Sequence, residues 1–248
     1  MKQLLGKLIR LLILLVLAPL ICSCSLEALS FLSSNLDLLS LDWFAIGFVV
    51  CVLVYAGASY TRGRICSDFQ FLRTLRHELA HAVTAMLTGG RIDRMEIVNP
   101  VERPGEIAVS AVEYASPVGP VSLISLAPYY LPLFTIPLLP LRFFVISWVR
   151  EVIDFLIGFT LGFHYVSFMD EFLGQRFGLG QTDIRKTGAI FSYVIIGFFN
   201  LLSLATVKAV LHNDWPARDQ LTRALVRGWE WYVLILQELR RYAARLQT

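Results

Sequence analysis

The sequence contains few charged residues. Asp, Glu, Lys and Arg make up 17% of the 248 residues, whereas hydrophobic residues make up 56%. An ordinary soluble domain has about a quarter of its residues charged and about half of them apolar, so the composition argues against a purely soluble protein. It also excludes a disordered chain, which needs low hydrophobicity and high net charge. The net charge of +3 is too small for a nucleic-acid-binding surface.

Cysteine is also scarce, with four residues at Cys22, Cys24, Cys51 and Cys66. No second pair of Cys or His completes a zinc spacing with Cys22 and Cys24, and the pattern indicates no disulfide framework. Cys51 lies in an apolar run, where we expect it to be buried. We expect Cys22 and Cys24 to pack in a core as well, rather than to be exposed to oxidation or acylation.

What the sequence has instead is long apolar stretches. A helix needs roughly 20 mostly apolar residues to cross a bilayer. Six stretches approach or exceed that length: Leu11–Leu26, Trp43–Thr61, Phe69–Leu87, Ala115–Leu141, Phe155–Met169 and Thr187–Val207. The first also has the layout of a secretory signal, but we favour an uncleaved span because further spans follow. The sequence therefore predicts an all-α polytopic membrane protein with about six hydrophobic helices.

Two segments between these helices carry their own signals. After Leu87 the pair Gly89–Gly90 predicts the end of a helix. Within Arg91–Tyr114, apolar residues alternate around the turn-forming segment Glu102–Gly105, which predicts a small β-hairpin. The following stretch, Ala115–Leu141, contains six prolines, which favour either one kinked span or a broken helical pair.

The positions of the positive charges predict how the chain is oriented in the membrane. Arg residues follow the second span between Arg62 and Arg76, and an excess of Lys and Arg marks the cytoplasmic side. We expect a multi-pass protein of the plasma (inner) membrane. Residues 212–248 mix Trp and Leu with many Arg and Glu, which is typical of an amphipathic helix on the membrane surface.

One motif points to chemistry. His77, Glu78 and His81 form the pattern His-Glu-x-x-His. Residues four apart share one face of a helix, so both imidazoles can reach one metal ion. Two His with one acid and an open position is the arrangement of a hydrolytic Zn²⁺ site, in which Glu78 is the general base.

The segment from Arg76 to Ile92 resembles the site-2 protease family of intramembrane zinc metalloproteases, in a divergent branch. It shares small residues after the second histidine, a glycine stop and a strand that begins at Arg91. The following hairpin resembles the membrane re-entrant β-loop of that family. The resemblance implies zinc-dependent peptide-bond hydrolysis in or beside the bilayer, on membrane protein substrates, by a membrane-embedded domain over residues 1–211.

The third metal ligand departs from the family pattern, which has Asn-Pro and Leu-Asp-Gly there. Two acids are candidates. Asp183 precedes the last span, as in a looser branch of the family, whereas Asp170 follows Phe168-Met169 at the end of a short span and loosely resembles Leu-Asp-Gly. We favour Asp183 because the family's third ligand opens a helix. A weaker alternative is the HtpX-like class, in which a later glutamate, here Glu171, is the ligand; Gln175 stands where that class has Asp.

Two further expectations follow. His164 is either a partner that orients a metal ligand or a hydrogen-bonded contact between helices. The alternative to an enzyme is a non-catalytic scaffold or pseudoprotease that binds transmembrane helices, which the missing Leu-Asp-Gly supports.

Overall fold

The computed structural model describes residues 2–33, 43–60, 64–97, 110–115, 121–176, 184, 187–211 and scattered residues from 223 to 238. Helices dominate these residues, as the sequence predicts. The chain divides into two compact units, one made of Met1–Leu38 with Tyr193–Thr248 and the other of Leu39–Ser192.

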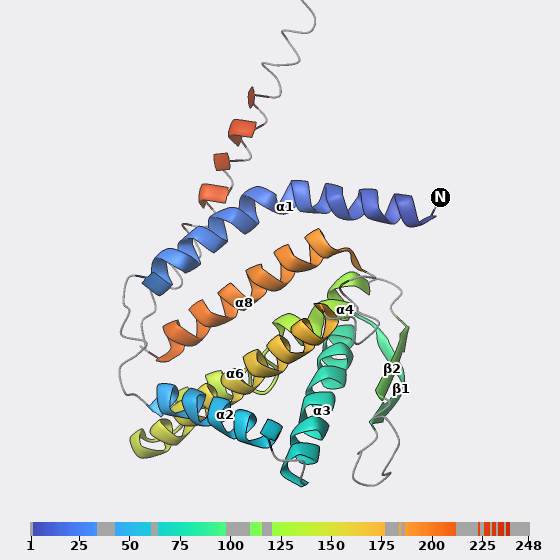
Figure 1. Cartoon of the computed structure of the whole chain (residues 1–248). Helices are drawn as coiled ribbons and strands as arrows, with labels where there is room; N and C mark the ends of the chain where they lie inside the picture. Colours follow the sequence, from blue (N-terminus) through green and yellow to red (C-terminus); the bar gives the residue numbers. More distant parts are fainter. Residues whose placement is uncertain are drawn as a thin grey trace, which may run out of the picture. The chain divides into compact units, whose positions relative to one another are not determined.

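The first unit contains α1 (Lys2–Ser33) and most of α8 (Ala189–Leu211) (Figure 1). The Lys208 side chain is 1% exposed, and its ammonium donates a hydrogen bond to the Leu32 carbonyl over 3.3 Å. Arg227 pairs with Glu27 of α1 at 2.6 Å. Most of the predicted amphipathic helix over 212–248 lies outside the described residues, so it stays a prediction.

Two cysteines of α1 test the packing expectation. Cys22 is exposed and Cys24 is half-buried, so core packing is wrong for Cys22. Its face of α1 is not covered by the part of the chain that the structure describes. Cys51 of the second unit is fully buried, as predicted.

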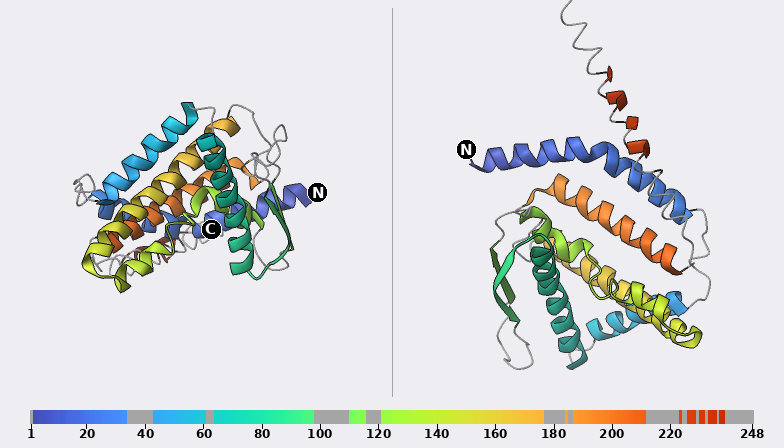
Figure 2. Two further views of the ribbon diagram at one scale, coloured as in Figure 1. Left: turned by 90° about the horizontal axis from the view of Figure 1, so that it is seen from below. Right: turned by 180° about the vertical axis from the view of Figure 1, so that it is seen from behind.

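The second unit holds the elements around the motif. They are α2 (Trp43–Tyr60), α3 (Arg64–Leu87), β1 (Arg91–Ile97), β2 (Ser110–Ala115), α4 (Val121–Tyr130), α5 (Leu138–Leu141) and α6 (Ser147–Arg176). Figure 2 shows α2 packed along α6, and the two strands beside α3.

Glycines bring α2 and α6 together. A Cβ atom at Gly47 would overlap the carbonyl oxygen of Phe155, and one at Gly158 would overlap that of Phe44. At Gly162 it would lie 3.2 Å from the Cβ of Cys51. Small residues four apart let two membrane helices approach closely and gain van der Waals contact. This interface fixes α6, the helix that later supplies polar groups to α3.

Helix α3 ends where the sequence predicts. Gly89 has a φ of +77°, a conformation that favours glycine. Its N–H bonds to the Met86 carbonyl at 3.1 Å, and the Gly90 N–H bonds to the Ala85 carbonyl at 2.7 Å, which is the Schellman pattern of a helix end. Strands β1 and β2 then pair antiparallel from Arg91↔Ala115 to Ile97↔Ser110. The predicted turn between them lies outside the described residues.

The proline-rich stretch is broken rather than singly kinked. It forms the ten-residue α4, a turn over residues 131–137 and the short α5, followed by a 3-10 turn, Arg142–Phe144. Arg142 then pairs with Asp154 of α6, from Nε to Oδ1 over 2.6 Å. This pairing gives the Asp154 carboxylate inside α6 a cationic partner. Helix α6 extends well beyond the predicted span Phe155–Met169 at both ends.

Among the described residues, two helices are long and apolar enough to cross a membrane, Ser147–Phe172 and Ala189–Leu211. Leu15–Ser30 and Trp43–Ala58 are shorter apolar helices. Large apolar side chains are exposed along them, among them Leu15, Leu53, Val152 and Ile190, as expected for surfaces that face lipid. Six spans and a plasma-membrane location stay predictions.

Candidate metal centre

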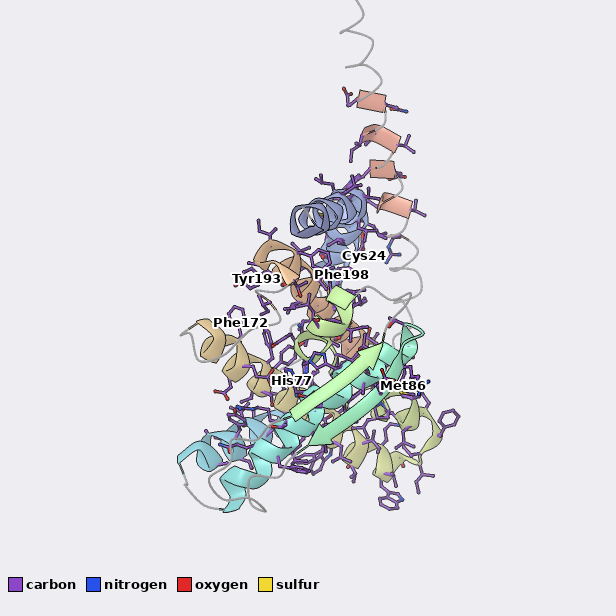
Figure 3. The ribbon with its side chains drawn as sticks, turned by 90° about the vertical axis from the view of Figure 1, so that its right-hand side faces the viewer. Cys24, His77, Met86, Phe172, Tyr193 and Phe198 are labelled. Atoms are coloured by element: carbon purple, nitrogen blue, oxygen red, sulfur yellow. The ribbon has the colours of Figure 1, made fainter. Side chains whose placement is uncertain are left out.

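The His-Glu-x-x-His motif lies in the second half of α3, where its helical spacing brings the two histidine rings together edge to face. The ring centroids of His77 and His81 are 4.9 Å apart and the rings are inclined at 74°. Glu78 is 7% exposed and His81 is 9% exposed. Figure 3 shows His77 in the middle of the unit, whereas Met86 lies at its periphery. The motif is thus enclosed by the neighbouring helices, although it begins only a few turns into α3.

A backbone carbonyl of α4 orients His81. The His81 Nδ1 lies 2.8 Å from the carbonyl oxygen of Ile124. In an α-helix this oxygen would accept the N–H of residue 128, but residue 128 is proline and has no N–H. The proline therefore leaves the Ile124 carbonyl available to His81, whose Nδ1 must be the donor.

A second proline frees a second carbonyl in the same way. The Pro128 oxygen would accept the N–H of residue 132, which is also proline. It accepts instead from Nη1 of Arg76 at 2.6 Å. The same Nη1 lies 3.2 Å from Nδ1 of His164 on α6. Arg76 has a side chain only 1% exposed, so these acceptors offset the cost of burying its charge.

Glu171 of α6 is the acid that contacts both Arg76 and His77. Its Oε1 accepts from Nη2 of Arg76 at 3.0 Å, and its Oε2 lies 3.1 Å from Nδ1 of His77. The side chain is 13% exposed. An ionised carboxylate only accepts hydrogen bonds, so Nδ1 of His77 carries the proton. The ring of Tyr129 packs edge to face against the ring of His77, with the two ring centroids 5.8 Å apart and the planes at 90°.

Both motif histidines thus share one tautomer. Each Nδ1 donates to an oxygen, and each Nε2 is the lone-pair nitrogen that binds a metal ion. Histidine nitrogens with a nearby carboxylate are the ligand chemistry that Zn²⁺ prefers. The two Nε2 atoms are therefore donors of the type that fits zinc, and His77 and His81 are its candidate ligands.

Of the two predicted acids, the structure describes only Asp170. Asp170 forms an ion pair with Arg73, and its side chain is 51% exposed. Asp183 lies outside the described residues. Across the described residues, no group of three His, Cys, Asp or Glu is arranged to hold a metal ion. The choice of third ligand stays a prediction.

Sequence reasoning did not predict the roles of Arg76 and Pro128. The sequence alone predicts only a cytoplasmic charge at Arg76 and a helix breaker at Pro128. A usable signal for Arg76 is its place within the apolar stretch Phe69–Leu87, since a charge inside such a stretch needs partners. His164 does contact a helix neighbour, as one of its two interpretations expected.

Residues 43–134, from the start of α2 to just beyond α4, match a family model described as Peptidase M50B-like. This segment is similar to the M50B-like peptidases. The match confirms the resemblance to the site-2 proteases. No curated protein and no solved structure matched the chain. The M50B-like segment contains the motif, Arg76 and both prolines, whereas Asp170, Glu171 and Asp183 lie beyond its end. Together with the apolar helices it indicates a membrane protein of the protease class.

Proposed function

We propose that the protein is a zinc-dependent intramembrane endopeptidase that hydrolyses peptide bonds in or next to transmembrane segments of substrate proteins. The observation that carries the proposal is the shared tautomer of His77 and His81, which leaves both Nε2 atoms as lone-pair nitrogens on one helix. The match of residues 43–134 to the M50B-like family model supports the same reaction class. Its partners are the lipid bilayer and a membrane protein substrate, not nucleic acid.

His77 and His81 hold the zinc ion, with Asp183 as the proposed third ligand and Asp170 as the alternative. The pairing of Asp170 with Arg73 favours Asp183. When bound, zinc supplies a water of pKa near 7 and polarises the scissile carbonyl. Glu78, buried next to His77 in the chain, removes a proton from the attacking water and passes it to the departing amine.

The decisive variant is Glu78→Gln. It keeps the shape and the two histidines but cannot accept the proton, so we expect full zinc content with hydrolysis reduced by about 10²–10⁴-fold. Zinc per chain is measured by elemental analysis on detergent-purified protein. Hydrolysis is measured on a transmembrane peptide in proteoliposomes. Glu151→Gln, an exposed glutamate of α6, is the matched control and should leave both unchanged.

Asp183→Ala and Asp170→Ala complete the set of variants. His77→Ala should lose zinc, and whichever of the two aspartate variants loses it as well identifies the third ligand. Undiminished turnover by Glu78→Gln would refute the role given to Glu78. A wild type that takes up no zinc after reconstitution, yet retains transmembrane peptides, would favour the non-catalytic scaffold instead.

A further inference from the structure

The carboxylate of Glu171 has both oxygens engaged by groups of α3. Oε1 accepts from Arg76 at 3.0 Å and Oε2 accepts from Nδ1 of His77 at 3.1 Å. Both residues that contact it are fixed in turn. Arg76 is held by the Pro128 carbonyl and by His164, and His77 lies against the Tyr129 ring.

We infer that Glu171 is a positioning residue that fixes the tautomer and orientation of His77 for the metal, and is not itself a metal ligand. The inference rests on the proposed function, because it concerns the same metal centre. Its reason is geometric: moving either oxygen of Glu171 onto a metal would take the acceptor from Nη2 of the buried Arg76 or from the Nδ1–H of His77. Carboxylates behind metal-binding histidines commonly set the ring in this way.

Arg76 makes the inference testable, because a guanidinium can only donate. In Glu171→Gln, the side-chain oxygen must face Arg76 to accept its hydrogen bond. The amide NH₂ then faces His77, so Nδ1 of His77 becomes an acceptor and the proton moves to Nε2. The variant is nearly isosteric, yet it reverses the tautomer and removes the lone pair that binds the metal.

The experiment uses the full chain in detergent, labelled with ¹⁵N-histidine. The chain has only four histidines, and comparison with His77→Gln assigns the signals of His77. In the metal-free wild type we expect Nδ1 of His77 to be protonated, and in Glu171→Gln we expect Nε2 to be protonated. Zinc affinity, measured by competition with a chelator, should fall by about 10–100-fold in the variant, while one zinc per chain is still bound at saturation.

Glu151→Gln is the matched control. It makes the same change of charge on an exposed glutamate of the same helix. We expect it to leave the His77 tautomer and the zinc affinity unchanged. If Glu171→Gln does not fold, Glu171→Asp keeps the charge for Arg76 and withdraws the carboxylate from His77. That variant should also weaken zinc binding.

Three results would overturn the inference. In the first, Glu171→Gln leaves the His77 tautomer and the zinc affinity unchanged, or Glu171→Asp, used if Glu171→Gln does not fold, leaves the zinc affinity unchanged. Glu171 would then have no positioning role, while the proposed function would stand. Complete loss of zinc at saturation, with an altered visible spectrum of the Co²⁺-substituted protein, would make Glu171 a ligand. A wild type that binds no zinc would defeat the proposed function, and the inference with it.

Discussion

Helix α6 contacts its two neighbours in opposite ways. Against α2 it uses Gly158 and Gly162, whose missing side chains let the backbones meet. Against α3 it uses the carboxylates of Asp170 and Glu171, which reach Arg73 and Arg76. Close apolar packing gains van der Waals contact without desolvating any charge. A buried ion pair stabilises the fold only by the amount by which its attraction exceeds the cost of desolvating both charges. The comparison indicates that the α2 side holds α6 in place and the α3 side orients groups at the motif.

Removal of Arg76 should have the largest effect on stability. Arg76→Met leaves the buried charge of Glu171 unpaired, and we expect the free energy of unfolding to fall by about 3–5 kcal/mol. Unfolding in mixed micelles, followed by circular dichroism, measures the change. The double variant Arg76→Met/Glu171→Leu should recover much of the loss because no charge is left buried. A single variant as stable as the wild type would contradict the buried pair.

The glycine interface should show the next largest effect. Gly47→Ala places a Cβ against the Phe155 carbonyl, so the helices must separate, at a cost of about 1–3 kcal/mol. Gly57→Ala is the control on the same helix, because a Cβ there meets nothing within 4 Å. The two variants are compared by the same unfolding assay. Equal stability would mean that α2 and α6 do not meet as described.

The exposed ion pair should matter least. Arg73 and Asp170 have side chains 32% and 51% exposed, and such pairs contribute about 0–1 kcal/mol. Arg73→Met should therefore change unfolding by less than about 1 kcal/mol and leave the zinc content unaltered. A loss as large as that of Arg76→Met would show that both pairs of this interface carry its stability.

Local signals in the sequence predicted α3 well. The histidine spacing, the glycine stop and the strand after it depend on residues close in the chain, and each is confirmed in the described residues. Helix α6 is longer than the predicted span Phe155–Met169, which begins directly after Asp154. The partner of Asp154, Arg142, comes from a turn twelve residues earlier, and a pairing of that kind is set by tertiary packing.

The choice between neighbouring acids was also beyond sequence reasoning. Asp170 and Glu171 are adjacent, so they project about 100° apart around α6. The rotation of α6 is fixed by its glycine contacts with α2, which a single sequence does not reveal. The sequence could name both acids, but it could not tell which of them contacts a motif histidine.

The proline in α4 has a consequence for how the site tolerates mutation. The partner of His77 is a side chain, so one codon change at Glu171 can remove it. The partner of His81 is the backbone oxygen of Ile124, which every amino acid at that position carries. That hydrogen bond can form because Pro128 has no N–H to donate to the Ile124 oxygen. A substitution of Pro128 can therefore affect His81 although Pro128 supplies no atom to the hydrogen bond. The two proposed metal ligands are thus exposed to mutation by different routes.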